Sequence, residues 1–142
     1  MLDTLLALIR RFEGLRLKPY RCPAGVPTVG YGHTGPDVTM ESPPITPDLA
    51  EDMAHDDGQR FARAAVKLSP NLITEPDRHA AIADFCFNLG TTRYKASTLR
   101  RKVQAKEWEE AQDELRKWVW GGGRRLPGLM LRREAEAALL SP

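Results

Sequence analysis

The sequence is poor in cysteine and histidine and has no long apolar run. Its two cysteines, Cys22 and Cys86, are too few for a disulfide framework, and neither they nor the three histidines follow the spacing of a metal site. The longest apolar stretch near the start, residues 5–9, is too short for a membrane span or for the apolar core of a signal peptide. We therefore expect no metal, no membrane span and no export signal in this sequence.

Charge is small overall and unevenly distributed. The formal net charge is +2, yet residues 37–57 hold seven acids and no lysine or arginine. Residues 93–133 hold twelve lysines and arginines against five acids. A basic region favours an anionic polymer, although the same charge is equally compatible with an ordinary solvated surface. Because no nucleic-acid motif is present, we expect no nucleic-acid partner, and an anionic cell wall fits the charge as well.

The first 35 residues predict one helix followed by a small sheet. Asp3 is a candidate N-cap, and apolar residues follow it at helical spacing. Gly14 favours the end of this helix near Glu13, because glycine tolerates the left-handed turn that ends helices. Residues 15–35 combine glycines and prolines with strand-favouring side chains. This composition predicts an antiparallel sheet with tight turns.

The rest of the chain predicts helices. Thr46 followed by Pro47 predicts a helix that runs to about Leu68. Thr74 and Asp77 resemble a capping box that begins a helix ending at Gly90. The other expected elements are helices over residues 97–104 and 107–118, a flexible loop at 121–123, and a last helix from Pro127 to about Leu139. A helix, a small sheet and then many helices predict an α+β fold.

Three residues near the start form a candidate for chemistry. Glu13 lies at a helix end, and Cys22 and Thr28 lie on the sheet that follows, so a bend after Glu13 would let all three line one cleft. Glycoside hydrolysis needs a proton donor on one face of the sugar and a group that activates water or attacks on the other. A glutamate partly shielded from water can hold such a proton. On spacing alone, however, each of these residue types is more often structural or at the surface.

The segment from Phe12 to Gly35 resembles the active-site segment of the phage-type lysozymes, glycoside hydrolase family 24. Their pattern is glutamate, eight residues, aspartate or cysteine, five residues and threonine, and Glu13, Cys22 and Thr28 match it. The flanking stretches Leu-Lys-Pro-Tyr and Gly-Tyr-Gly-His-Thr-Gly also match. Further along, residues 85–90 (FCFNLG) resemble the helix beside the cleft, and residues 126–129 (LPGL), with Arg132 and Arg133, resemble the C-terminal helix. The resemblance covers nearly the whole chain.

The resemblance implies a lysozyme-like fold within one catalytic domain, residues 1–142. A small sheet lobe, at about residues 15–35, and a larger helical lobe, at about residues 46–142, would enclose an active-site cleft. Glu13 would be the general acid, and Thr28 would help to hold the attacking water. Cys22 stands where better-studied members carry aspartate. Since a thiol has a reference pKa of about 8.5, Cys22 would act as a thiolate base or nucleophile, or as a neutral thiol that orients water.

The resemblance also implies a substrate and a setting. Phe87 and Asn88 would line the sugar cleft, and Arg132, on the last helix, would lie near Glu13 and contribute to substrate binding. The bond cleaved would be the β-1,4 bond between N-acetylmuramic acid and N-acetylglucosamine in bacterial peptidoglycan. No cofactor is implied, and we expect a monomer. The chain would be a phage or prophage endolysin that waits in the host cytoplasm and then acts on the cell wall from the periplasm.

Three other functions are compatible with the same residues. A lytic transglycosylase would use Glu13 alone and form an anhydro sugar without adding water. A cysteine hydrolase would use Cys22 with His33 to cut peptide cross-links, although we expect His33 to be structural and Cys86 to lie in the core. A non-catalytic wall-binding domain would keep the fold and lose the chemistry.

Overall fold

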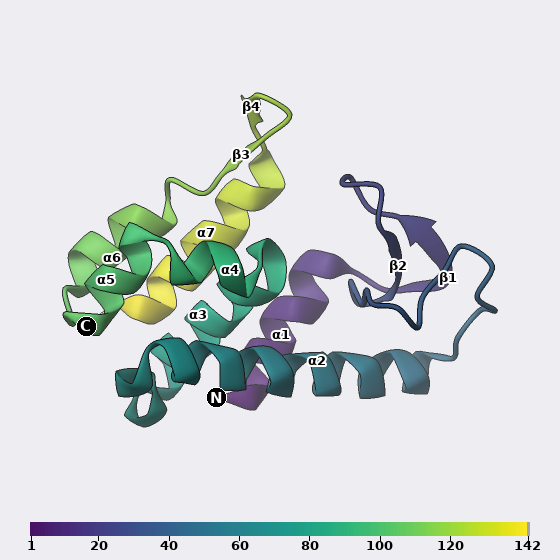
Figure 1. Cartoon of the computed structure of the whole chain (residues 1–142), viewed down its shortest axis with the longest axis horizontal. Helices are drawn as coiled ribbons and strands as arrows, with labels where there is room; N and C mark the ends of the chain where they lie inside the picture. The colour runs from purple at the N-terminus through teal and green to yellow at the C-terminus, as the bar shows by residue number, and fades with distance from the viewer. Residues whose placement is uncertain (142) are drawn as a thin grey trace.

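The computed structural model describes residues 1–141, in which a small two-stranded sheet lies beside a larger group of helices (Figure 1). None of the helices in this part of the chain is both long and apolar enough to cross a membrane. In chain order the elements are α1 (Leu2–Glu13), β1 (Arg16–Arg21), β2 (Pro27–Gly30), α2 (Pro47–Leu68), the 3-10 helix η1 (Pro70–Thr74), α3 (Pro76–Leu89), α4 (Thr91–Lys95), α5 (Thr98–Gln104), α6 (Trp108–Leu115), β3 (Trp120–Gly121), β4 (Arg124–Arg125) and α7 (Pro127–Leu140).

Helix α3 forms the centre of the helical region. All residues from His79 to Cys86 are buried, and the helix packs against α1, α2 and α7. Burying one side chain of the size of Phe85 contributes about 2–3 kcal/mol. The predicted inward position of Cys86 is confirmed, and burial raises the pKa of its thiol to about 12. Cys86 is therefore an uncharged core residue.

Helix α2 connects the two regions. Its 22 residues span about 33 Å, and Figure 1 shows it running beneath both the sheet and the helices. Thr46 caps it as predicted, because its hydroxyl accepts a hydrogen bond from the Leu49 amide at 3.1 Å. The helix contacts both β2 and α3, so it sets the sheet against the helical region.

The sheet follows directly from the end of α1. Gly14 takes a φ of 70°, which ends the helix after Glu13 as predicted. Strands β1 and β2 pair antiparallel, with Tyr20 opposite Thr28. This arrangement folds the sheet back toward the end of α1 and confirms the predicted helix and sheet at the N-terminal end.

Two predicted helix caps are wrong. Helix α1 begins at Leu2, with Met1 as its cap, so Asp3 lies inside the first turn, where a carboxylate still suits the helix dipole. Thr74 and Asp77 form no capping box. The chain makes the short helix η1 before them, and α3 begins at Pro76, which is favoured in a first turn because it lacks an N–H.

The prediction for residues 107–125 also needs correction. Helix α6 ends at Leu115 and not at 118, and residues 120–125 form the hairpin β3–β4 instead of a flexible loop. Gly122 and Gly123 both have positive φ, at 59° and 79°, and close this hairpin as a two-residue turn. The short helix α4 was not predicted. The predicted helices ending at Leu68 and Gly90, and those near 97–104 and 127–139, are confirmed.

Candidate active site

A cleft of about 380 Å³ lies where the end of α1, the sheet and the end of α3 meet. Of the six residues predicted from the sequence for the site, five line this cleft, and Arg132 lies behind it. The lining residues are Glu13, Tyr20, Cys22, Pro23, Ala24, Val26, Thr28, Gly32, Thr34, Phe87 and Asn88. Side chains from three separate parts of the chain therefore meet in one hollow.

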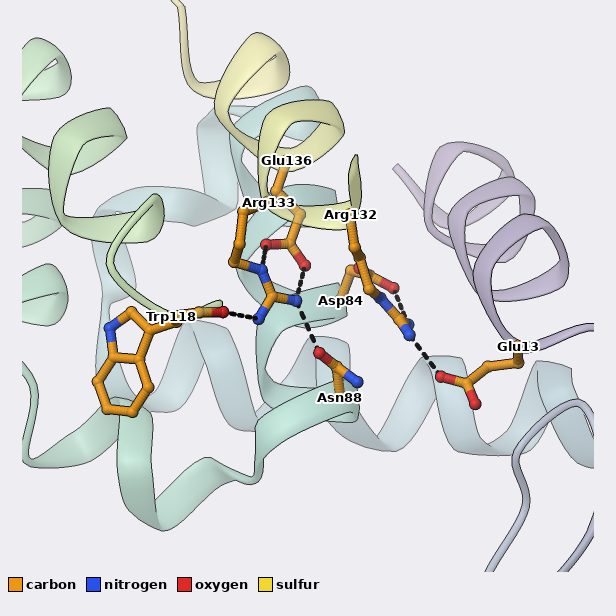
Figure 2. A network of polar contacts seen from close by, with 7 residues as sticks. All are labelled: Glu13, Asp84, Asn88, Trp118, Arg132, Arg133 and Glu136. Atoms are coloured by element: carbon orange, nitrogen blue, oxygen red, sulfur yellow. Dashed lines mark hydrogen bonds and ion pairs between the residues drawn. The ribbon is translucent and has the colours of Figure 1, made fainter. Parts of the chain in front are cut away.

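Glu13 is the last residue of α1, and its side chain is 20% exposed, at the edge of the cleft. Its Oε2 accepts a hydrogen bond from Arg132 Nη1 at 2.5 Å (Figure 2). Gly32 lies against the same carboxylate, because a Cβ at this position would come within 2.5 Å of Glu13 Oε1. Gly32 also has a φ of 71°, which side chains rarely adopt. The position thus suits glycine for two reasons.

Arg132 is 3% exposed and is held by a second carboxylate, that of Asp84 on α3. Its Nε donates to Oδ2 at 2.8 Å and its Nη2 to Oδ1 at 2.7 Å. The rings of Phe12 and Phe87 lie 5.6 and 5.8 Å from the guanidinium. Burial opposes the charge, but Asp84 and Glu13 raise the pKa of Arg132 above its ordinary value. Arg132 is a fixed cation whose donors point to carboxylates.

Cys22 lies on the opposite side of the cleft, at the start of the turn between β1 and β2. It is a free thiol. Desolvation raises the pKa of this thiol, but hydrogen bonds from the backbone of Val26, Ala24 and Gly25 lower it below the ordinary value. The turn therefore favours the thiolate more than the sequence neighbourhood alone would suggest.

Thr28 is 2% exposed and lies on β2, next to Cys22 in the cleft lining. Its hydroxyl donates a hydrogen bond to the Val26 carbonyl at 2.8 Å. Because a hydroxyl has one proton and two lone pairs, its oxygen can still accept a bond from a group in the cleft.

His33 lies outside the cleft lining and connects the sheet region to α2. Its Nδ1 lies 2.7 Å from Asp57 and its Nε2 lies 2.9 Å from Asp37. The hydrogen bond to Asp57 is the main cause that raises the pKa of His33 to about 9, against the effect of burial. Both ring nitrogens face carboxylates and the ring is charged at neutral pH. His33 is therefore placed as a structural cation and not as a base for Cys22.

Three neighbours of the site were not predicted from the sequence. Tyr20 lies near the end of β1 and lines the cleft two positions before Cys22, and the two-residue period of a strand would have found it. In the sequence, Gly32 is one of several glycines within residues 15–35, and nothing there relates it to Glu13. Asp84 is one helical turn before Asn88 on α3, so the i, i+4 spacing places both on one face. Nothing in the sequence pairs Asp84 with Arg132.

The comparison with protein families decides the class. The family described as phage lysozyme matches residues 10–136. The chain belongs to the phage lysozyme family. It is therefore a glycoside hydrolase of the lysozyme class, an endolysin-type muramidase that degrades bacterial peptidoglycan.

Individual relatives agree with the family. The chain is 39% identical to the endolysin of Acyrthosiphon pisum secondary endosymbiont phage 1, over 94% of this chain and 92% of the relative. It is 38% identical to the SAR-endolysin of Escherichia phage Mu, over 89% and 72%. Among solved structures, the muramidase domain of SpmX from Asticaccaulis excentricus has a TM-score of 0.81 at 28% identity, covering 97% and 95%. The endolysin of Escherichia coli O157:H7 phage FAHEc1 has a TM-score of 0.79 at 28% identity, covering 96% and 90%. The lysozyme-like α+β fold is thus confirmed.

Proposed function

We propose that the chain is a member of glycoside hydrolase family 24 with a Glu/Cys/Thr catalytic triad. It would hydrolyse the β-1,4 bond between N-acetylmuramic acid and N-acetylglucosamine. The observation that carries this proposal is that Glu13 of α1 shares one cleft with Cys22 and Thr28 of the sheet. An acid on one wall and a water-handling pair on the other is the arrangement that glycoside hydrolysis requires.

The reaction we propose divides the work between the two walls. Glu13 gives its proton to the glycosidic oxygen as the bond to the sugar breaks. A water molecule donates a hydrogen bond to the Thr28 oxygen and attacks from the sheet side. Cys22, as a thiolate, takes the proton that this water loses, and the proton returns to Glu13 through solvent before the next cycle. Direct attack by water from the side opposite the leaving group inverts the anomeric carbon.

The remaining predicted residues take supporting roles in this proposal. Phe87 gives the cleft an apolar wall, and Asn88 offers an amide that can hydrogen-bond to sugar hydroxyls or acetamido groups. Arg132 acts on the substrate only through Glu13, because it is buried and its donors are directed to Glu13 and Asp84. No cofactor enters the reaction.

We further propose that residues 1–142 act as one catalytic domain and as a monomer. The setting would be that of the phage endolysins the chain resembles, with release from the host cytoplasm and action on the wall from the periplasm. The excess of lysine and arginine over residues 93–133 favours contact with the anionic wall.

Mass spectrometry of fragments from purified peptidoglycan tests the proposal. Hydrolysis yields muropeptides with a free reducing end, carrying one added water, and the NMR spectrum of fresh product shows inversion. Anhydro sugars would instead identify a lytic transglycosylase. Cleaved peptide cross-links with intact glycan would identify a cysteine hydrolase, and no fragments from a folded protein would identify a binding domain.

A further inference from the structure

Two consecutive arginines of α7 point to different parts of the cleft. Successive residues of a helix are about 100° apart around its axis. Arg132 accordingly reaches Glu13, whereas Arg133 Nη2 donates to Asn88 Oδ1 at 2.8 Å (Figure 2). Arg133 Nη1 also reaches the Trp118 carbonyl at 3.4 Å. Neighbouring residues of α7 therefore contact two elements of the cleft: Arg132 contacts Glu13 of α1, and Arg133 contacts Asn88 of α3.

Each arginine has a buried carboxyl behind it. Asp84 binds Arg132 through both of its oxygens. Glu136 Oε1 accepts a hydrogen bond from Arg133 Nη2 at 2.9 Å, whereas Oε2 lies 2.7 Å from Nε as an ion-pair contact without hydrogen-bond geometry. Asp84, Arg133 and Glu136 are all fully buried, so none of them can touch a glycan in the cleft. Their effect on the reaction has to pass through Glu13 and Asn88.

The pKa values of the two carboxyls are shifted in opposite directions. Burial alone would raise the pKa of Asp84, but the hydrogen bonds and charge of Arg132 lower it below its ordinary value. Burial raises the pKa of Glu136 well above its ordinary value, and the adjacent charge of Asp84 raises it further. The pKa shifts of the two carboxyls are therefore opposite in direction, although each carboxyl faces a buried arginine. Buried ion pairs add little net stability. Their role here is to fix the positions of the side chains that line the cleft.

We infer that Asp84 and Glu136 are positioning residues: Asp84 holds Arg132 on Glu13, and Glu136 holds Arg133 on Asn88. The inference rests on the proposed function, because it takes Glu13 as the acid and Asn88 as a contact to the glycan. The two arms have different consequences. Loosening Arg132 frees the acid and affects turnover, whereas loosening Arg133 frees a binding amide and affects the affinity for substrate.

Asp84→Asn and Glu136→Gln form a matched pair, since each replaces one buried carboxyl by its amide. We expect Asp84→Asn to lower kcat by about 10- to 100-fold, because a misplaced acid loses its alignment, with KM on soluble uncross-linked glycan strands unchanged within about twofold. Glu136→Gln places an amide NH2 against the Arg133 donors. We expect it to raise KM by about 3- to 10-fold, the value of one hydrogen bond, with kcat unchanged within about twofold. Thermal unfolding and near-UV circular dichroism establish that each variant is folded at the assay temperature.

A double-mutant cycle separates positioning from general destabilisation. If Asp84 acts only through Arg132, Asp84→Asn adds less than about a twofold change in kcat to Arg132→Gln. A further drop of tenfold in the double variant would overturn the inference. The comparison of the double variant with Arg132→Gln needs no folded Asp84→Asn single variant. It does need a folded Arg132→Gln variant, in which the buried Asp84 carboxylate has lost its charged partner.

The activity of Glu13→Gln distinguishes a failure of this inference from a failure of the proposed function. An active Glu13→Gln variant removes Glu13 as the acid, whatever Asp84 does. An inactive Glu13→Gln variant beside a folded Asp84→Asn variant of unchanged kcat overturns the inference alone. The inference would also be overturned if Asp84→Asn and Glu136→Gln changed kcat and KM to the same extent as each other, in proportion to the stability that each variant loses.

Discussion

The two walls of the cleft are built in different ways. On the sheet wall, Cys22 and Thr28 interact with the backbone of the turn between them, within six residues of chain. On the helical wall, Glu13 bonds to Arg132, which is 119 positions away, and Arg132 bonds to Asp84, 48 positions away. The first wall is held by contacts within one turn, and the second is held by contacts between helices that are distant in sequence.

This difference separates chemistry from stability. A change at Cys22 alters a partly exposed side chain of one short turn, so it can remove function and leave the fold intact. A change behind the helical wall leaves a buried charge without its partner, which costs about 3–5 kcal/mol. The variants below test this separation.

Glu13→Gln has the largest expected effect. The amide keeps the shape and still offers an oxygen to Arg132, but it has no proton to give. General acid catalysis contributes roughly 10²- to 10⁴-fold, so the release of reducing ends from peptidoglycan should fall by at least that factor. The melting temperature should change little compared with this loss. Activity within about tenfold of the wild type would contradict the assignment of the acid.

Substitutions of Cys22 test the sheet wall. Cys22→Asp supplies a base that is ionised at neutral pH and should stay within about tenfold of wild-type activity. Cys22→Ala should lose about 100-fold or more, because nothing remains to take the proton of the water. Cys22→Ser should lie between them if orientation matters more than charge. All three should melt within a few degrees of the wild type. An active alanine variant would show that Cys22 is a bystander, and a folded but inactive aspartate variant would argue against a base.

The same contrast explains which parts of the site could be predicted from the sequence. Glu13, Cys22 and Thr28 lie within sixteen residues, so their spacing, with the helix end at Gly14, allows them to meet, and the resemblance to the phage-type lysozymes predicts that they do. Asp84 cannot be found in this way. Its partner Arg132 lies on another helix, and only the packing of α3 against α7 brings the two together.

Caps, prolines and glycines also predicted most of the fold. They predicted it wrongly where one residue type is compatible with two local structures. Thr46 beside Pro47 gave a correct helix start because cap and proline agree. Thr74 carried the same kind of signal, but the 3-10 helix η1 occupies that stretch and Pro76 sets the start of α3 instead. The glycines at 121–123 predicted flexibility, whereas the left-handed conformations of Gly122 and Gly123 close a hairpin. In each case tertiary packing selected between alternatives that the local sequence allows.

Thr28→Val has a smaller expected effect, and it also probes the sheet wall. The substitution keeps the β-branched shape that suits a strand and removes the hydroxyl. Losing one hydrogen bond to the attacking water should lower kcat by about tenfold. Thr28→Ser, which retains the hydroxyl, is the matched control and should keep most of the activity. If Thr28→Val unfolds early and its turnover is normal, Thr28 is structural.

The smallest expected effect is a change in stability with pH. It arises because the two walls are attached to the rest of the molecule by different charged groups. The helical wall depends on Arg132, whose raised pKa keeps it charged throughout the alkaline range. The sheet region is joined to α2 through His33, which lies between Asp57 and Asp37, with Arg60 also on Asp57. The pKa of His33 is raised from 6.5 to about 9 in the folded state.

Because the pKa of His33 is higher in the folded state, the charged histidine stabilises the fold. This contribution is complete below the unfolded-state pKa of about 6.5 and is lost as the pH rises through about 9. After allowance for solvent screening and partial exposure, we expect the unfolding free energy to fall by about 1 to 2 kcal/mol over this interval. His33→Gln has no titrating group there, so its unfolding free energy should lack this component, and Cys22→Ser provides a control for the titration of the thiol. Amide hydrogen exchange, corrected for its intrinsic pH dependence, should show the loss of protection in β1 and β2 before α3 and α7. An equal loss in both regions, or a wild-type slope in His33→Gln, would show that the two walls do not differ in their attachment.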